Sequence, residues 1–214
     1  MGINGSPRKG WNTHTLVAEA LKGASSRGAL TELIDLYDLN FKGHVSHFEY
    51  KRKGGLSFGK YTHKDGLYPI LEKLTGCDGF IIGSPIYVGE VSADVRALFE
   101  RLTFQYITYR QDAFTFNPRR KPVLLIYTIK VPEQALEETG YNAKFRFYEE
   151  RFNQIIGPAK TLVCTETRQT ADFSKFKMSM FNEAVRKKWR EKVFPQDRRK
   201  AFALGAALTD PVKD

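Results

Sequence analysis

The sequence predicts an α/β protein with a doubly wound parallel sheet, and three observations support this prediction. Short, continuous apolar runs recur along the chain, as expected for strands that are buried on both faces. Apolar stripes with helical spacing lie between these runs, and loops containing Gly-Ser-Pro follow two of the predicted strands. Regular alternation of strands with helices favours a parallel sheet that is covered by helices.

The first predicted strand is short, because only Met1–Asn4 precede a Gly-rich turn. Either the chain starts upstream of this Met or the fold accepts a short strand. A helix is predicted from about Asn12–Thr13 to about Gly23. The later predicted strands are Leu30–Leu36, Gly79–Ile82, Val123–Thr128 and Thr161–Cys164.

Three further stripes predict the helices that alternate with these strands. In the first two, apolar residues recur at i, i+3, i+4 and i+7, so each stripe forms one apolar helix face. The third ends at Gly157-Pro158, a typical helix stop. The stripes are Leu67, Ile70, Leu71 and Leu74; then Val95, Leu98, Phe99 and Leu102; and then Phe145, Tyr148, Phe152, Ile155 and Ile156.

Two segments are additional to this alternation of strands and helices. Residues 103–121 form a long aromatic and basic connection, which we expect near the ligand-binding edge of the sheet, at an acceptor or subunit boundary. From about residue 172 to 214 we expect a helical extension of one domain that spans 1–214. Its apolar stripe, predicted to pack against the domain or a second subunit, is Met178, Phe181, Val185, Trp189 and Val193.

The composition excludes several classes of protein. Of the 214 residues, 42% are hydrophobic and 27% are charged, which is typical of globular domains. No apolar run approaches the ~20 residues that span a bilayer, and the N-terminus lacks the apolar core of a secretory signal. Two cysteines are too few for a disulfide framework. We therefore expect a cytoplasmic protein without a membrane partner; its net charge of +10 favours anionic partners but selects none.

The first Gly-Ser-Pro loop, which begins at Gly5, has the features of a phosphate site. It follows a strand and precedes a helix, where backbone amides and the helix dipole attract an anion. Ser6 and Thr13 offer hydroxyl groups, Arg8 offers a positive charge, and Asn12 can cap the helix while facing the anion. The loop is not a Walker loop, because Trp11-Asn12 occupies the position where that motif has Lys-Ser/Thr. The Gly-x-Gly-x-x-Gly pattern of dinucleotide-binding proteins is also absent, although Asp35 lies where such proteins carry a ribose-binding acid.

The second such loop, Gly83–Asp94, follows another buried strand and leads into a helix. In open α/β sheets a ligand binds at the carboxyl ends of the strands, at the switch point. Tyr87 is placed to lie against a flat ring, with the backbone amides of Ile86–Gly89 reaching its polar edge. Together the two loops predict a monophosphate site beside a site for a planar ring.

These two motifs resemble the NADPH-dependent FMN reductase and iron–sulfur flavoprotein branch of the flavodoxin-like superfamily. The resemblance covers about residues 2–165 and implies a five-stranded sheet of order 2-1-3-4-5, non-covalent FMN and a homodimer or homotetramer. It implies that Ser6, Arg8, Asn12 and Thr13 hold the phosphate, with Thr128 as a weaker candidate in a third flavin loop. The residues that would line the isoalloxazine are Pro85, Ile86, Tyr87, Val88 and Gly89.

The chain departs from the iron–sulfur members of this branch, which carry Cys-x-x-Cys-x-x-Cys after the second strand. Here that stretch is His44-Val-Ser-His-Phe-Glu-Tyr50, so we expect no iron–sulfur cluster. His44 and His47, with His14 and His63 elsewhere, are a weak metal-binding pattern without Cys or carboxylate partners, and we expect no metal site.

The resemblance implies an enzyme that uses NAD(P)H as co-substrate and passes electrons through FMN to a small molecule: a quinone, a nitro- or azo-aromatic, or free flavin. No side chain is predicted to be catalytic. The alternatives are a flavodoxin-type electron carrier, which net +10 disfavours, and a non-catalytic binding module. We expect no nucleic-acid partner, since the sequence contains no recognisable recognition helix or stacking platform.

Overall fold

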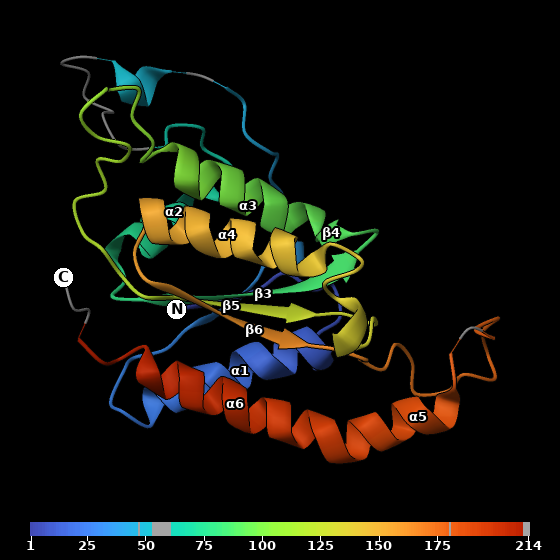
Figure 1. Ribbon diagram of the computed structural model, residues 1–214. Helices are drawn as coiled ribbons and strands as arrows, with labels where there is room; N and C mark the ends of the chain where they lie inside the picture. The colour runs from blue at the N-terminus through green and yellow to red at the C-terminus, as the bar shows by residue number, and fades with distance from the viewer. Residues whose placement is uncertain (47, 53–60, 180, 212–214) are drawn as a thin grey trace.

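The computed structural model describes residues 1–46, 48–52, 61–179 and 181–211, and five strands within them form a parallel sheet (Figure 1). The strands are β1 (Gly2–Asn4), β2 (Leu33–Asp35), β3 (Phe80–Tyr87), β5 (Val123–Thr128) and β6 (Ala159–Cys164). Their order is β2-β1-β3-β5-β6. The predicted order 2-1-3-4-5 is thus confirmed, because β5 and β6 are the fourth and fifth parallel strands. The two-residue β4 (Glu90–Val91), which pairs antiparallel with the end of β3, was not predicted.

Helices cover both faces of the sheet. They are α1 (Asn12–Ser25), α2 (Tyr68–Gly76), α3 (Ala93–Phe104), α4 (Tyr141–Ile155), α5 (Glu183–Lys188) and α6 (Phe194–Ala207). Figure 1 shows α2, α3 and α4 on one face, with α1 and α6 on the other. A π-helical turn, Trp189–Val193, joins α5 to α6. No helix in the described part of the chain is both long enough and apolar enough to span a membrane.

The central strands β3 and β5 are largely apolar because each contributes to two hydrophobic cores. Along β5, Val123, Leu125 and Tyr127 belong to the core beneath α3 and α4. Leu124 and Ile126 belong to the core beneath α1 and α6. This alternation explains why continuous apolar runs were a sound signal for the inner strands. The apolar run Leu30–Leu36 predicted the edge strand less well, since Leu30 is fully exposed and β2 contains only three residues.

Within the described residues, the extension expected from about residue 172 is helical only from Glu183 onward, and its apolar stripe is only partly buried. Trp189 is buried in the core beneath α1 and α6, whereas Val185 and Val193 are exposed. The wider winding of the π-helical turn changes the face on which Val193 lies relative to Trp189. Val185 precedes this turn, which does not explain its exposure.

The expected position of residues 103–121 is wrong. Helix α3 begins at the carboxyl edge of the sheet and runs back, so the segment that follows it emerges at the opposite edge (Figure 1). There the Nδ2 of Asn117 donates to the carbonyl of Ile155 at 3.1 Å, and the Nζ of Lys121 donates to that of Leu74 at 3.0 Å. This segment therefore does not border the ligand-binding edge of its own chain.

Candidate functional site

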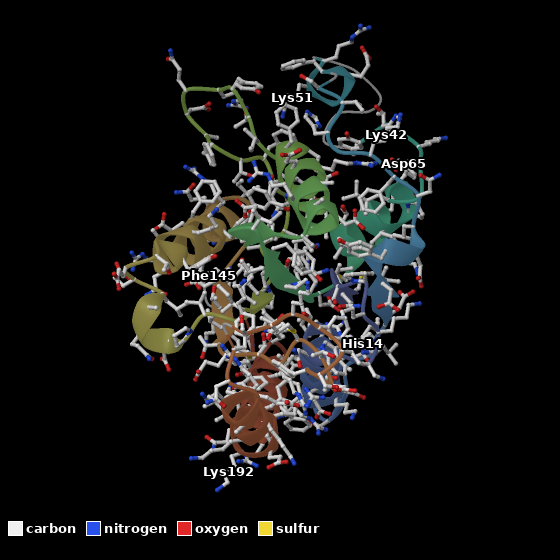
Figure 2. The ribbon with its side chains drawn as sticks, turned by 90° about the vertical axis from the view of Figure 1, so that its right-hand side faces the viewer. His14, Lys42, Lys51, Asp65, Phe145 and Lys192 are labelled. Carbon is white, nitrogen blue, oxygen red and sulfur yellow. The ribbon has the colours of Figure 1, made fainter. Side chains whose placement is uncertain are left out.

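A cleft of about 540 Å³ opens at the carboxyl ends of the parallel strands. Figure 2 views the molecule from this side, with Phe145 of α4 and His14 of α1 labelled on the two layers that flank the sheet. All ten residues predicted to bind the cofactor line the cleft: Ser6, Arg8, Asn12, Thr13, Pro85, Ile86, Tyr87, Val88, Gly89 and Thr128. The fold thus brings together the two loops predicted from sequence motifs and the third loop, at Thr128, that the family resemblance implied.

The first loop is fixed where β1 and β3 lie side by side. The amide of Gly5 donates to the carbonyl of Gly83 at 2.8 Å, and the hydroxyl of Ser92 donates to the carbonyl of Gly5 at 2.7 Å. A Cβ at position 5 would come within 2.0 Å of a methyl group of Val95, so only glycine permits this approach. The first loop and the beginning of α3 are therefore locked together.

The side chains of Asn12 and Arg8 contact a segment that the sequence analysis did not include, residues 167–169 after β6. The Nδ2 of Asn12 donates to the carbonyl of Arg168 at 2.9 Å, and the Nη1 of Arg8 donates to that of Gln169 at 2.6 Å. Arg190, from the π-helical turn, donates to the Oδ1 of Asn12 at 2.8 Å. The residue at the N-cap of α1 is Trp11, and Asn12 lies inside the first turn, so its expected capping role is wrong.

The second loop ends in a tight turn between β3 and β4. Tyr87 pairs with Glu90, which leaves Val88 and Gly89 as the two turn residues, with φ of 48° and 83°. Positive φ at both positions is the signature of a type I′ turn, which Asn-Gly normally supplies. A β-branched valine with positive φ is strained, and Val88 is fully exposed, so no side-chain packing compensates for the strain.

The third loop follows β5. The hydroxyl groups of Thr128 and Thr13 lie 2.7 Å apart in the interior, which connects this loop directly to the first turn of α1. Sequence reasoning missed seven residues that also line the cleft: Trp11, Ile129, Lys130, Tyr141, Thr167, Arg168 and Gln169. The rule that ligands lie beyond strand ends, applied to β6, would have found the last three.

The charged side chains that line the cleft are all cationic: Arg8, Lys130 and Arg168. No carboxylate lines it within the described residues. Burial raises the pKa of Tyr87, although the charge of Arg8 and a contact with Ser6 oppose the shift, so its phenol stays neutral at physiological pH. Asp35 lies outside the cleft, where it accepts from Asn4 and pairs with Lys9 at 3.4 Å, which does not favour a ribose-binding role.

The histidines do not form a metal centre in the part of the chain that is described, where no group of three or more metal-ligating side chains converges. His44 contacts the hydroxyl of Tyr61 and the ring of Phe104, and His63 lies 3.6 Å from Asp65. His47 lies outside the described residues. Of the two cysteines, Cys77 precedes β3 and Cys164 ends β6, at opposite edges of the sheet.

The sequence profile described as NADPH-dependent FMN reductase matches residues 1–139, which is more than half of the chain. The chain belongs to the NADPH-dependent FMN reductase family. The match ends before α4, so residues 167–169 and the C-terminal helices, which contact the first loop, lie outside it.

The chain is similar to an iron–sulfur flavoprotein of Methanocaldococcus jannaschii, with 39% identity over 101 residues. That match covers 47% of this chain and 50% of the relative, so the chain spans about half the length of the curated protein it matches.

Solved structures show the same fold at low sequence identity. An NAD(P)H:quinone oxidoreductase from Methanothermobacter marburgensis has a TM-score of 0.70 at 16% identity, over 99% of this chain and 97% of that one. An azoreductase from Bacillus anthracis has a TM-score of 0.63 at 11% identity, over 96% and 97%. Both comparisons confirm the flavodoxin-like fold that the sequence predicts.

Proposed function

We propose that this protein binds FMN in the cleft and oxidises NAD(P)H, passing the electrons to a small-molecule acceptor. The convergence of the three predicted loops on one cleft, at the switch point between β1 and β3, is the observation that carries the proposal. A volume of about 540 Å³ lies within the range of cofactor sites.

The residues present fit FMN from its phosphate to its ring. At one end of the cleft, the beginning of α1 and the cation Arg8 provide donors for a phosphate, with Ser6 and Thr13 beside them. At the other end, Tyr87 and the Val88–Gly89 turn provide a ring face and backbone amides. Trp11 and Arg168 also fit, since each has a buried side-chain nitrogen without a hydrogen-bond partner.

FMN, when bound, would supply the electron transfer itself. The protein's residues would bind and orient it: the first loop would hold the phosphate and the second would fix the plane of the ring. The bonds from Gly5 to Gly83 and from Ser92 to Gly5 keep these two loops at a set separation, and the contact of Thr128 with Thr13 ties the third loop to α1. Tyr87 is neutral, and it would serve as a ring face rather than as an acid or base.

Family membership favours a quinone, a nitro- or azo-aromatic, or free flavin as the acceptor. Tyr87, Tyr141 and Trp11 line the cleft and are suited to stacking against such planar molecules. The electron-carrier alternative is disfavoured by the net charge of +10, since carriers of this fold are usually acidic.

Anaerobic mixing with NADH or NADPH tests the proposal. The purified protein should be yellow, the flavin absorbance should bleach on mixing, and menadione should restore it over many cycles. If dithionite reduces the bound flavin but neither nucleotide does, the protein is a carrier or a binding module. Steep, salt-dependent binding to DNA would favour the binding module.

The same preparation tests the expectation that no iron–sulfur cluster is present. Elemental analysis of protein purified anaerobically should show no stoichiometric iron and only trace zinc. One metal per chain that disappears when His44 and His47 are both replaced would contradict this expectation.

A further inference from the structure

Four charged or phenolic side chains around the Val88–Gly89 turn have no role in the function proposed above. Lys144 and Tyr148 lie one helical turn apart on α4, Glu90 lies on β4, and Arg96 lies on α3. We propose that Lys144, Tyr148 and Glu90 form a clamp that holds the Val88–Gly89 turn in its strained conformation, and that this clamp positions the turn for the flavin. The inference deepens the function proposed above and rests on it.

Lys144 connects the turn to α4 through two contacts. Its Nζ donates to the carbonyl of Gly89 at 2.6 Å and to the Oε2 of Glu90 at 3.0 Å. The first of these bonds is made to the backbone of the turn itself, at Gly89, whose φ is 83°. Because α4 packs against the sheet, it provides a rigid support for this contact.

Tyr148 and the amide of Val91 complete the coordination of Glu90. The Tyr148 hydroxyl donates to the Oε1 of Glu90 at 2.9 Å, and the same oxygen accepts from the amide of Val91 at 2.9 Å. Arg96 donates to the Tyr148 oxygen at 3.3 Å. Every carboxylate oxygen of Glu90 thus has a donor, so the carboxylate is fixed between α4 and β4.

The ionisation states suit this arrangement. Burial raises the pKa of Tyr148 to about 12, so its hydroxyl is protonated and can donate at neutral pH. Burial alone would raise the pKa of Glu90, but the Val91 amide, Lys144 and Tyr148 outweigh it and lower the pKa. Glu90 therefore remains an acceptor throughout the physiological range.

Strain at Val88 explains why a clamp is needed. A non-glycine residue in the left-handed region is strained and persists only where the surroundings impose it. Val88 is fully exposed and the strand that follows has only two residues, so packing of the Val88 side chain imposes nothing. The buried Val91 and the bond from the amide of Ser92 to the Oγ of Ser84 at 2.9 Å anchor the far end of β4, and the bonds from α4 restrain the turn itself.

Amide hydrogen exchange in the ligand-free protein tests the clamp without requiring a cofactor. In Lys144→Met and in Tyr148→Phe, the amides of Glu90 and Val91 should exchange about tenfold faster than in the wild type, and the core strands should be unchanged. Lys144→Arg, which keeps a donor, should restore most of the protection. Arg146→Met, on the exposed face of the same helix, is the matched control and should change nothing.

A second arm measures FMN binding by fluorescence titration. We expect Lys144→Met to raise the Kd for FMN about tenfold and to shift the flavin absorbance bands. The combination with Val88→Gly, which relieves the strain, should make the effect of Lys144→Met on exchange smaller. Unchanged exchange in both Lys144→Met and Tyr148→Phe would overturn the clamp.

The two measurements distinguish failure of the clamp from failure of the proposed function. If the wild type binds no FMN, the proposed function fails, and the exchange arm still decides whether the clamp exists. If Lys144→Met loses protection in the core strands as well, it has unfolded, and Tyr148→Phe, which preserves the packed ring, decides the clamp instead.

Discussion

Arg8 and Ser6 are the residues through which the phosphate loop can be tested most directly. Both line the cleft, and the Oγ of Ser6 accepts from the amide of Arg8 at 3.2 Å, so the two act within one turn of chain. Replacing both by Ala should weaken FMN binding, since each charge-assisted bond contributes about 1.5–3 kcal/mol. Isothermal titration should show at least a tenfold rise in Kd. An unchanged Kd in the double variant would contradict the assignment.

Arg101 of α3 forms an ion pair with Asp65, in which the arginine is buried and the carboxylate is largely covered. Arg101 is fully buried and donates to both carboxylate oxygens, at 2.7 and 2.9 Å, and to the carbonyl groups of Lys42 and His63 (Figure 2 labels Lys42 and Asp65). Arg101→Met leaves Asp65 without its partner and should lower the free energy of unfolding by about 3–5 kcal/mol in urea titrations. Lys73→Met, which breaks the exposed pair with Glu32, should cost about 0–1 kcal/mol.

The same pair predicts a dependence of stability on pH. Burial acts to raise the pKa of Asp65, but its bonds with Arg101 outweigh this and lower it below its ordinary 3.8. A carboxyl group with a lowered folded-state pKa stabilises the fold above its ordinary pKa, and this contribution disappears as the pH falls through the lowered value. Wild-type stability should therefore fall below about pH 4 more steeply than that of Asp65→Asn. Parallel curves for the two proteins would show that the pair makes no such contribution.

Individual residues also show which parts of the site could be predicted from the sequence and which could not. Nine of the ten predicted residues lie in two short motifs that follow strands, so local rules could find them, whereas Thr128 came from the family resemblance. Arg190 lies 178 positions from Asn12, and its contact depends on the π-helical turn and on how α6 packs against α1. Such a contact has no local signal. The strain at Val88 was equally hidden, because valine is not a residue that predicts a type I′ turn.

Among the elements, α1 and α6 make the closest helix contact, and two glycines permit it. A Cβ at Gly205 would lie 1.9 Å from the carbonyl oxygen of Ala20, and one at Gly23 would lie 1.9 Å from that of Phe202. Gly205→Ala should force the helices apart and lower the free energy of unfolding by about 1–3 kcal/mol, despite the higher helix propensity of alanine. Thermal and urea unfolding would measure the loss.

Gly76→Ala is the matched control, since Gly76 ends α2 and a Cβ there would meet no atom within 4 Å. It should leave stability nearly unchanged. Gly205→Ala should also weaken FMN binding, because displacing α6 moves Arg190 away from Asn12. Equal stability of the two variants would mean that the close approach of the helices is not required.

At the scale of the whole molecule, the two edges of the sheet have different surfaces. The cleft occupies the carboxyl edge, and exposed aromatic side chains gather at the other, where residues 103–121 meet the loop of residues 48–51. Phe48, Tyr109 and Phe114 are 54%, 68% and 48% exposed, and the rings of Phe48 and Tyr109 lie 6.0 Å apart. Lys51, labelled in Figure 2, lies over the Tyr109 ring at 5.5 Å. Exposed aromatic clusters of this kind are typical of protein–protein interfaces.

We therefore predict that residues 103–121 contribute to the subunit boundary of a homodimer or homotetramer, although they do not border the cleft of their own chain. Light scattering coupled to size exclusion should show an oligomer for the wild type and a smaller species for the variant Tyr109→Ser with Phe114→Ser. Leu30→Ser, at an isolated and fully exposed position, should keep the wild-type size. A monomeric wild type, or an unchanged oligomer in the double variant, would contradict this role. The result also bears on the cleft, since loss of turnover only in the smaller species would mean that an acceptor site requires a second subunit.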